Sequence, residues 1–165
     1  MTTPSKNYAF IDGNNLHMGL RLAGWKLDDR RFRVYLREHY GVVKAYYFIG
    51  YSEDHLSMYR RLQEAGYILI FKPMVKVSDG TMKGNVDAEL VLQVMIDLPI
   101  YDKAIVVSGD DDFTCLVRHL VSVEKFGMVL APVLRRCSSL LKKASGKQIA
   151  FMDGLEKKLA YHFHK

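Results

Sequence analysis

The segment YAFIDGNN, residues 8–15, decides the fold class of this chain. Its first half is a short apolar run of the kind that forms a buried strand, and Asp12 follows where that strand should end. Residues 104–112, AIVVSGDDD, repeat the arrangement: an apolar run leads through Ser108 and Gly109 into three consecutive aspartates. Two expected strands of this chain therefore end in carboxylates.

Similar strands alternate with helix-like segments along the rest of the sequence. We expect strands over residues 8–11, 42–48, 67–71, 104–107, 128–132 and 148–152. We expect helices over residues 16–22, 56–65, 112–126, 138–144 and 155–162, with Gly66 and Gly127 as helix stops. Two more helices are expected, one capped by Asp28 or Asp29 and running to residue 40, and one that opens at Asn85 or Asp87 and ends before Pro99. Apolar strands separated by helices indicate a three-layer α/β/α sandwich with a mostly parallel central sheet. Ligands of such sheets bind beyond the carboxyl ends of the strands, where the strand order reverses.

Composition narrows the class of protein. The 165 residues, 49% of them hydrophobic, are enough for one core, and we predict a single domain over residues 1–165. The polar start MTTPSKN lacks the apolar segment of a secretion signal, and the longest stretch without a charge, residues 126–134, is about half a membrane span. Two cysteines without C-x-x-C spacing indicate reduced thiols, so we predict a cytoplasmic protein with no membrane partner. The formal net charge of +6 favours a polyanionic partner.

The aspartates predict a metal site. If the strands that start at Tyr8 and Ala104 are neighbours, Asp12, Asp110 and Asp112 converge, and the helix that begins near Asp87 brings a fourth carboxylate. Carboxylates this close together repel one another unless they share a proton or bind a cation. Oxygen ligands without cysteine or histidine suit Mg²⁺ or Mn²⁺ rather than Zn²⁺. Helix capping by single aspartates is the alternative explanation.

Three motifs in a fixed order carry a family resemblance. They are FIDGNNL at residues 10–16, KGNVD at residues 83–87 and VSGDDDF at residues 107–113. With them the sequence resembles the NYN or LabA-like branch of the PIN-like nuclease superfamily. That resemblance implies a PIN-like, Rossmann-like sandwich, an Mg²⁺ or Mn²⁺ site and RNA as the substrate.

The resemblance also assigns residues by position. Asp12, Asp87, Asp110 and Asp112 match the catalytic and metal-binding acidic residues of the family, and Asn15 matches the polar residue beside the first of them. Ser108 lies in the third motif, and we expect it to contact substrate together with Asn15. Asp111 stands where the family varies. The basic stretch 142–147 departs from relatives, which usually carry an acidic residue there, and its charge suits contact with a substrate backbone.

The expected loop over residues 72–84 is polar, basic and longer than most connections in compact domains. Since it leads directly to Asp87, we expect Lys72, Lys76 and Lys83 to contact substrate phosphates. The function predicted is a metal-dependent ribonuclease.

Other functions fit the sequence less well. The alternative is a catalytically inactive RNA-binding or regulatory module with the same fold, and a homodimer stays open. A receiver-type phosphoacceptor would need an aspartate after Phe71, where Lys72 and Pro73 stand. The turn after the first strand has no G-x-G-x-x-G, which excludes a dinucleotide-binding enzyme.

Overall fold

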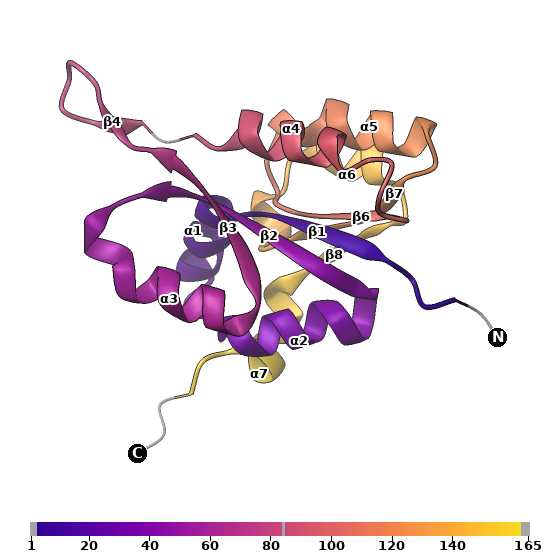
Figure 1. Ribbon diagram of the computed structural model, residues 1–165, viewed down its shortest axis with the longest axis horizontal. Coiled ribbons are helices and arrows are strands. Elements are labelled where there is room, and N and C mark those ends of the chain that lie inside the picture. Colours follow the sequence, from indigo (N-terminus) through magenta and orange to yellow (C-terminus); the bar gives the residue numbers. More distant parts are fainter. Residues whose placement is uncertain (1–2, 84, 163–165) are drawn as a thin grey trace.

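A single parallel sheet forms the centre of the computed structural model, which describes residues 3–83 and 85–162, the side chains of 82 and 83 excepted (Figure 1). Its strand order is β3-β2-β1-β6-β7-β8. The strands are β1 (Asn7–Asp12), β2 (Val42–Tyr51), β3 (Tyr67–Pro73), β6 (Ala104–Val107), β7 (Phe126–Ala131) and β8 (Ile149–Phe151). The order reverses between β1 and β6, which pair with Tyr8 beside Ala104. The expected neighbourhood of these two strands is therefore confirmed.

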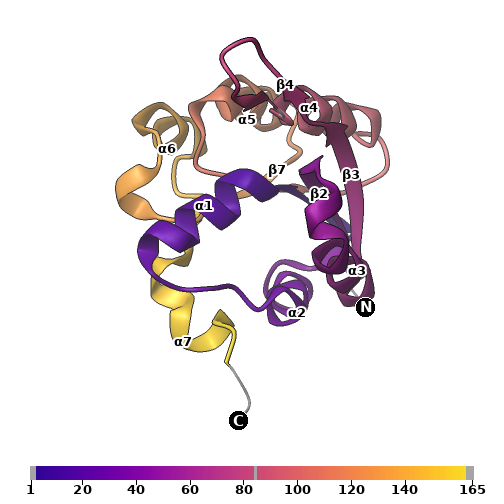
Figure 2. The ribbon, with the colours of Figure 1, turned by 90° about the vertical axis from the view of Figure 1, so that its left-hand side faces the viewer.

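Helices cover both faces of the sheet (Figures 1 and 2). One face carries α1 (Gly13–Ala23), α2 (Asp29–Tyr40), α3 (Leu56–Ala65) and the short α7 (Glu156–Leu159). The other face carries α4 (Asp87–Ile96), α5 (Thr114–Ser122) and α6 (Ser139–Ser145). Single 3-10 turns occupy Glu53–His55, Asp111–Phe113, Leu134–Arg136 and Met152–Leu155. This arrangement confirms the predicted three-layer α/β/α sandwich.

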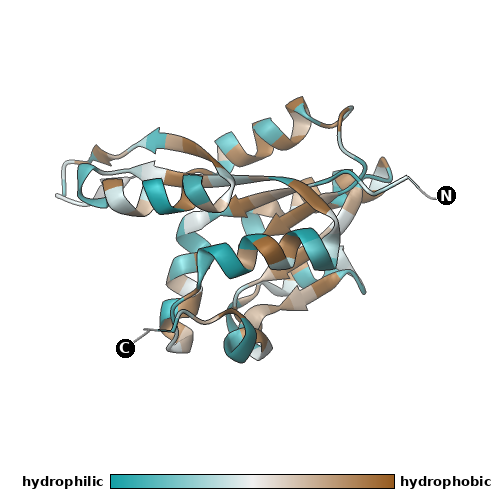
Figure 3. Ribbon diagram, turned by 60° about the horizontal axis from the view of Figure 1, so that its bottom comes forward, coloured by the Kyte–Doolittle hydropathy of each residue, from teal (hydrophilic) through white to brown (hydrophobic). Residues whose placement is uncertain are grey.

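Alternation along the strands builds two cores, one on each face of the sheet. In β1, Tyr8 and Phe10 pack beneath α4 and α5, whereas Ala9 and Ile11 pack against α1 and α2. All four residues are buried, because strands covered on both sides have no solvent face. Figure 3 shows the consequence as hydrophobic strands between helices that carry hydrophobic and hydrophilic stripes.

Gly66 ends helix α3, as the sequence predicts. Gly66 follows α3 with φ of 101°, and its N–H donates to the carbonyls of Gln63 and Leu62. Only glycine adopts this left-handed conformation at little cost. The predicted helix stop at Gly66 is therefore confirmed.

The predicted helix over residues 112–126 differs from the structure at both ends. A 3-10 turn precedes α5, and the helix ends at Ser122 because Phe126 is buried in the core and already belongs to β7. Gly127 lies inside β7, so its predicted role as a helix stop is wrong. A Cβ atom there would lie 2.8 Å from Cδ1 of Ile105 and 3.0 Å from the carbonyl oxygen of Ala104. This glycine permits close packing of the strands.

The expected loop over residues 72–84 contains a short antiparallel hairpin. Its strands are β4 (Val75–Lys76) and β5 (Met82–Lys83), and it extends from the body of the protein beyond β3 (Figure 1). At the turn, the Asp79 carboxylate accepts hydrogen bonds from the N–H and hydroxyl of Thr81. Gly84 lies outside the described residues.

The last helix, α7, is shorter than predicted, because Ala160 instead pairs with Leu27 in an antiparallel bridge. Within the described part of the chain, no helix combines the length and apolar character that crossing a membrane requires.

Candidate metal centre

Asp12 ends β1 and begins α1. Its Oδ1 accepts a hydrogen bond from the backbone N–H of Asn15 at 3.2 Å, and its Oδ2 accepts one from the Ser108 hydroxyl at 3.3 Å. Only 5% of the residue is exposed. The Asp12 carboxylate therefore caps α1 and also belongs to the candidate site, and hydrogen bonds hold both of its oxygens.

Asp110 takes the equivalent place after β6. Its Oδ1 accepts a hydrogen bond from the backbone N–H of Asp112 at 3.0 Å, and its own N–H donates to the Ser108 hydroxyl at 3.2 Å. Ser108 therefore donates to Asp12 and accepts from Asp110. One buried hydroxyl fixes the two strand ends relative to each other.

Asp87 is the first residue of α4. Its backbone N–H donates to Oδ1 of Asn85 at 2.8 Å, so Asn85 forms the turn that aims Asp87. The Asp87 carboxylate caps no helix. Its Oδ2 is buried and has no hydrogen-bond partner among the described residues. A buried oxygen without a partner is costly unless a proton or a cation satisfies it.

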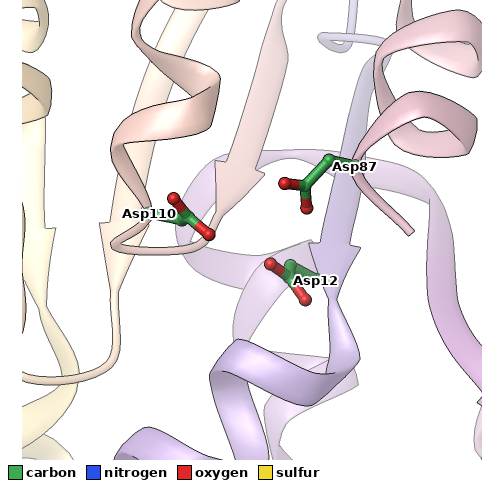
Figure 4. A group of neighbouring side chains, drawn as sticks. All are labelled: Asp12, Asp87 and Asp110. Atoms are coloured by element: carbon green, nitrogen blue, oxygen red, sulfur yellow. The ribbon is translucent and has the colours of Figure 1, made fainter. Parts of the chain in front are cut away.

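These three carboxylates point toward one another (Figure 4). Asp12, Asp87 and Asp110 each offer an oxygen, and the three oxygens lie within 4.8 Å of one another. The donors are all carboxylate oxygens, which suits a hard divalent cation such as Mg²⁺ or Mn²⁺. The residues present therefore fit a metal ion.

The electrostatics of the cluster support the same interpretation. Burial raises the pKa of Asp12 above its ordinary value, and the charge of Asp110 adds to this, while the N–H of Asn15 opposes it. Burial, a hydrogen bond to Asp112 and the charges of Asp12 and Asp110 raise the pKa of Asp87 to about 7. The pKa of Asp110 is also raised, chiefly by burial. Because of these shifts, the cluster keeps a proton near neutral pH unless a cation replaces it.

Asp112, the fourth predicted ligand, lies at the rim of the cluster. It is exposed, and its carboxyl group lies close enough to Asp87 to help raise the pKa of that residue. It also forms a second close group with Asp110 and the exposed Asp111, in which one oxygen of each lies within 4.8 Å of the others. Asp112 is thus placed beside the three-carboxylate cluster rather than inside it.

Asn15 and Ser108, the two polar residues expected to bind substrate, make hydrogen bonds within the protein. The Asn15 side-chain oxygen accepts the N–H of Gly109 at 2.9 Å, which ties the first turn of α1 to the loop after β6. Ser108 is fully buried. In this structure its hydroxyl has no exposed surface and contacts Asp12 and the N–H of Asp110.

The expected phosphate-binding lysines are placed differently from one another. Lys72 lies in β3 and pairs with Glu89 of α4, with 3.3 Å between Nζ and Oε1. Lys76 is exposed on β4. The side chain of Lys83 lies outside the described residues. Part of the Lys72 charge is therefore compensated within the protein, whereas Lys76 faces solvent.

Two supporting residues are not among the predicted site residues. Asn85 stands two positions before Asp87, which is the spacing of an Asx turn. Glu89 shares the first turn of α4 with Asp87, but no sequence signal links it to Lys72. Local chemistry could have identified the first contact, whereas the second depends on tertiary structure.

Comparison with known proteins agrees with this geometry. Residues 7–149 match the NYN domain. The chain is 28% identical over 143 residues to the low amplitude and bright protein LabA of Synechococcus elongatus, across 76% of this chain and 77% of the relative. A solved structure, a protein of unknown function from Vibrio parahaemolyticus, superposes with a TM-score of 0.80 at 24% identity, covering 96% of this chain and 99% of that one.

A more distant likeness is to the flap endonuclease of bacteriophage T5, in a complex with DNA and metal ions. Its TM-score is 0.48 at 14% identity, over 76% of this chain and 55% of that one, which is too distant to bear on the fold. The family match, by contrast, spans most of the sequence and contains all of the clustered carboxylates. This chain belongs to the NYN domain family.

Proposed function

We propose that this protein is a ribonuclease that hydrolyses RNA phosphodiester bonds with a bound Mg²⁺ or Mn²⁺ ion. The observation that carries the proposal is the convergence of Asp12, Asp87 and Asp110, with one buried oxygen of Asp87 left without a partner. Membership of the NYN family and the resemblance to PIN-like nucleases support it. RNA rather than DNA follows from the resemblance alone.

Asp12, Asp87 and Asp110 would hold the ion, with Asp112 at the rim. When bound, a divalent ion lowers the pKa of water and neutralises charge that develops on the phosphate and the leaving oxygen. The protein contributes a set of fixed ligands. Hydrogen bonds hold both Asp12 oxygens and one Asp110 oxygen, so these side chains lose little freedom when a ligand arrives.

Basic residues lie on both sides of the cluster at the carboxyl edge of the sheet. The hairpin with Lys76 follows β3, while Arg135 and Arg136 follow β7. The segment that carries Arg135 and Arg136 is tied to the loop of Asp110, because the N–H of Ser138 donates to the carbonyl of Gly109 at 3.1 Å. Their charges suit a polynucleotide backbone that crosses the cluster from one group to the other.

Cleavage of labelled single-stranded RNA in Mn²⁺ tests the proposal. Asp12→Asn should lower the cleavage rate by at least about 100-fold, because removing one group that stabilises transition-state charge commonly costs that much. RNA binding, measured by fluorescence anisotropy, should persist. Asp54→Asn, which changes an exposed carboxylate in the turn before α3, is the matched control and should cleave normally. Equal rates for Asp12→Asn and the parent would refute the nuclease assignment.

Binding measurements test the basic hairpin separately. Lys76→Ala should weaken RNA binding and lower the log–log salt slope by about 0.7 for each phosphate that the lysine neutralises. Lys157→Ala, at an exposed position of α7 on the other face of the sheet, should leave binding unchanged. A parent protein that binds RNA in this way without cleaving it would favour the alternative, an RNA-binding module with the same fold.

A further inference from the structure

The outward face of α4 is apolar along its whole length. Leu90 and Val94 point into the core, as expected for a covering helix. The residues on the solvent side carry no charge either; they are Ala88, Leu92, Met95 and Ile96, followed by Pro99 and Ile100. A helix on a protein surface normally shows polar residues to water, so a helix whose outward face is apolar is normally covered.

Exposure at this face is high. Leu92 is 61% exposed, Ile96 58% and Ile100 50%, and Met95 between them is 38% exposed. We call these four residues the α4 face. Leu92 and Ile96 are one helical turn apart, so they form a ridge of the kind that packs against a second helix.

Further apolar surface lies beside the C-terminal end of α4, where α5 also ends. Lys125 donates from Nζ to the carbonyl of Tyr101, and Lys103 donates from Nζ to the carbonyl of Glu124, which ties the segment after α4 to the segment after α5. There Val121 is 49% exposed and Val123 is 40% exposed. Together with the α4 face they leave on the order of 500 Å² of apolar surface, at the upper end of what monomers expose.

We propose that the α4 face is the interface of a homodimer, in which α4 packs against α4 of a second copy about a two-fold axis. The area fits, because two such patches would bury on the order of 1,000 Å², and a polar rim brings this into the range of about 1,200–2,000 Å² that stable interfaces bury. An apolar patch is also its own complement, as an interface with two-fold symmetry requires.

The charge distribution permits a second copy at this face. Each copy carries a formal net charge of +6, so two copies repel over most orientations. The α4 face has no charged residue, so this approach brings no like charges into direct contact. A nucleic acid would need basic groups that the face lacks. The interface begins more than one turn after Asp87, and the proposal does not depend on the ribonuclease activity.

Analytical ultracentrifugation of the full chain tests the dimer. The parent should sediment with the mass of two chains, and Leu92→Glu should sediment with the mass of one. The matched control is Leu56→Glu, at a residue of α3 that is 56% exposed on the opposite face, and it should stay dimeric. A parent that is monomeric at every concentration, including one that binds lipid vesicles as a monomer, would overturn the proposal. So would a folded Leu92→Glu protein that remains dimeric.

Cross-linking decides the matter if Leu92→Glu fails to fold. Ile96→Cys is made in a Cys115→Ser background, because Cys115 is the exposed native thiol and Cys137 is buried. A short bismaleimide should link two copies through Ile96→Cys much more than through Leu56→Cys in the same background. Equal yields at the two positions would overturn the α4 interface.

Discussion

Replacing Asp87 with asparagine removes one negative charge from the carboxylate cluster without removing a helix cap. Asp12 and Asp110 both accept a backbone N–H at the start of a helical turn, so changing either of them also costs a cap. The backbone N–H of Asp87 donates to Asn85, and Asp87→Asn keeps that contact. This substitution therefore isolates the effect of charge on stability.

The pKa of Asp87 sets the direction of the pH dependence. Its rise from 3.8 to about 7 means that, between these values, the folded protein keeps a proton that the unfolded chain has released. The metal-free parent should therefore lose stability as the pH rises through this window. Full conversion of the shift gives at most about 4 kcal/mol. Because Asp87 is partly open to water, screening reduces this to about 1–2 kcal/mol.

Thermal melts in the presence of EDTA measure this effect. At about pH 8, Asp87→Asn should melt about 2–8 °C above the parent, and at about pH 4 the difference should vanish. Mn²⁺ should raise the melting temperature of the parent more than that of the variant, because the variant has lost a ligand. Asp54→Asn should follow the parent throughout. A metal-free Asp87→Asn protein that melts below the parent at high pH would refute the repulsion argument.

Three other substitutions test the supporting structure by thermal melts. Ser108→Ala removes two hydrogen bonds and should cost about 1–3 kcal/mol while weakening Mn²⁺ binding; unchanged Mn²⁺ affinity would contradict its positioning role. Tyr46→Phe removes a 2.5 Å hydrogen bond to the buried Asp97 at the end of α4 and should cost about 1–3 kcal/mol, whereas a neutral result would mean that Asp97 finds another partner. Gly127→Ala should cost about 1–3 kcal/mol through its contact with Ile105, and Gly154→Ala, with open space around its Cβ, should not.

The layer architecture could be predicted from the sequence because a strand that is buried on both faces of the sheet is apolar along its whole length. Strands such as residues 104–107 have no polar side, and the helices between them end at residues such as Gly66. Boundaries were predicted less well. The limits of β7 depend on Phe126 entering the core and on the close approach of Gly127 to Ile105, and both are contacts between distant parts of the chain.

The cluster of carboxylates was predictable for the same topological reason. Once β1 and β6 are neighbours in a parallel sheet, Asp12 and Asp110 must lie at the same edge. The detailed division of roles was not predictable. That Ser108 is buried and that Lys72 pairs with Glu89 depends on side-chain packing between elements, which leaves no periodic signal in the sequence.

The pairing of β6 with β1 also sets the time at which the cluster can form. Ser108 and Asp12 touch across 96 positions of sequence, and β6 lies between β1 and β7 in the finished sheet. While the chain is being synthesised, Asp12 leaves the ribosome well before the strand that completes the cluster, and Asp87 leaves it shortly before that strand. Strands that pair across such a distance assemble late. If the protein cleaves RNA as proposed, the nascent chain therefore has no assembled cluster while the early part of its own messenger is being translated.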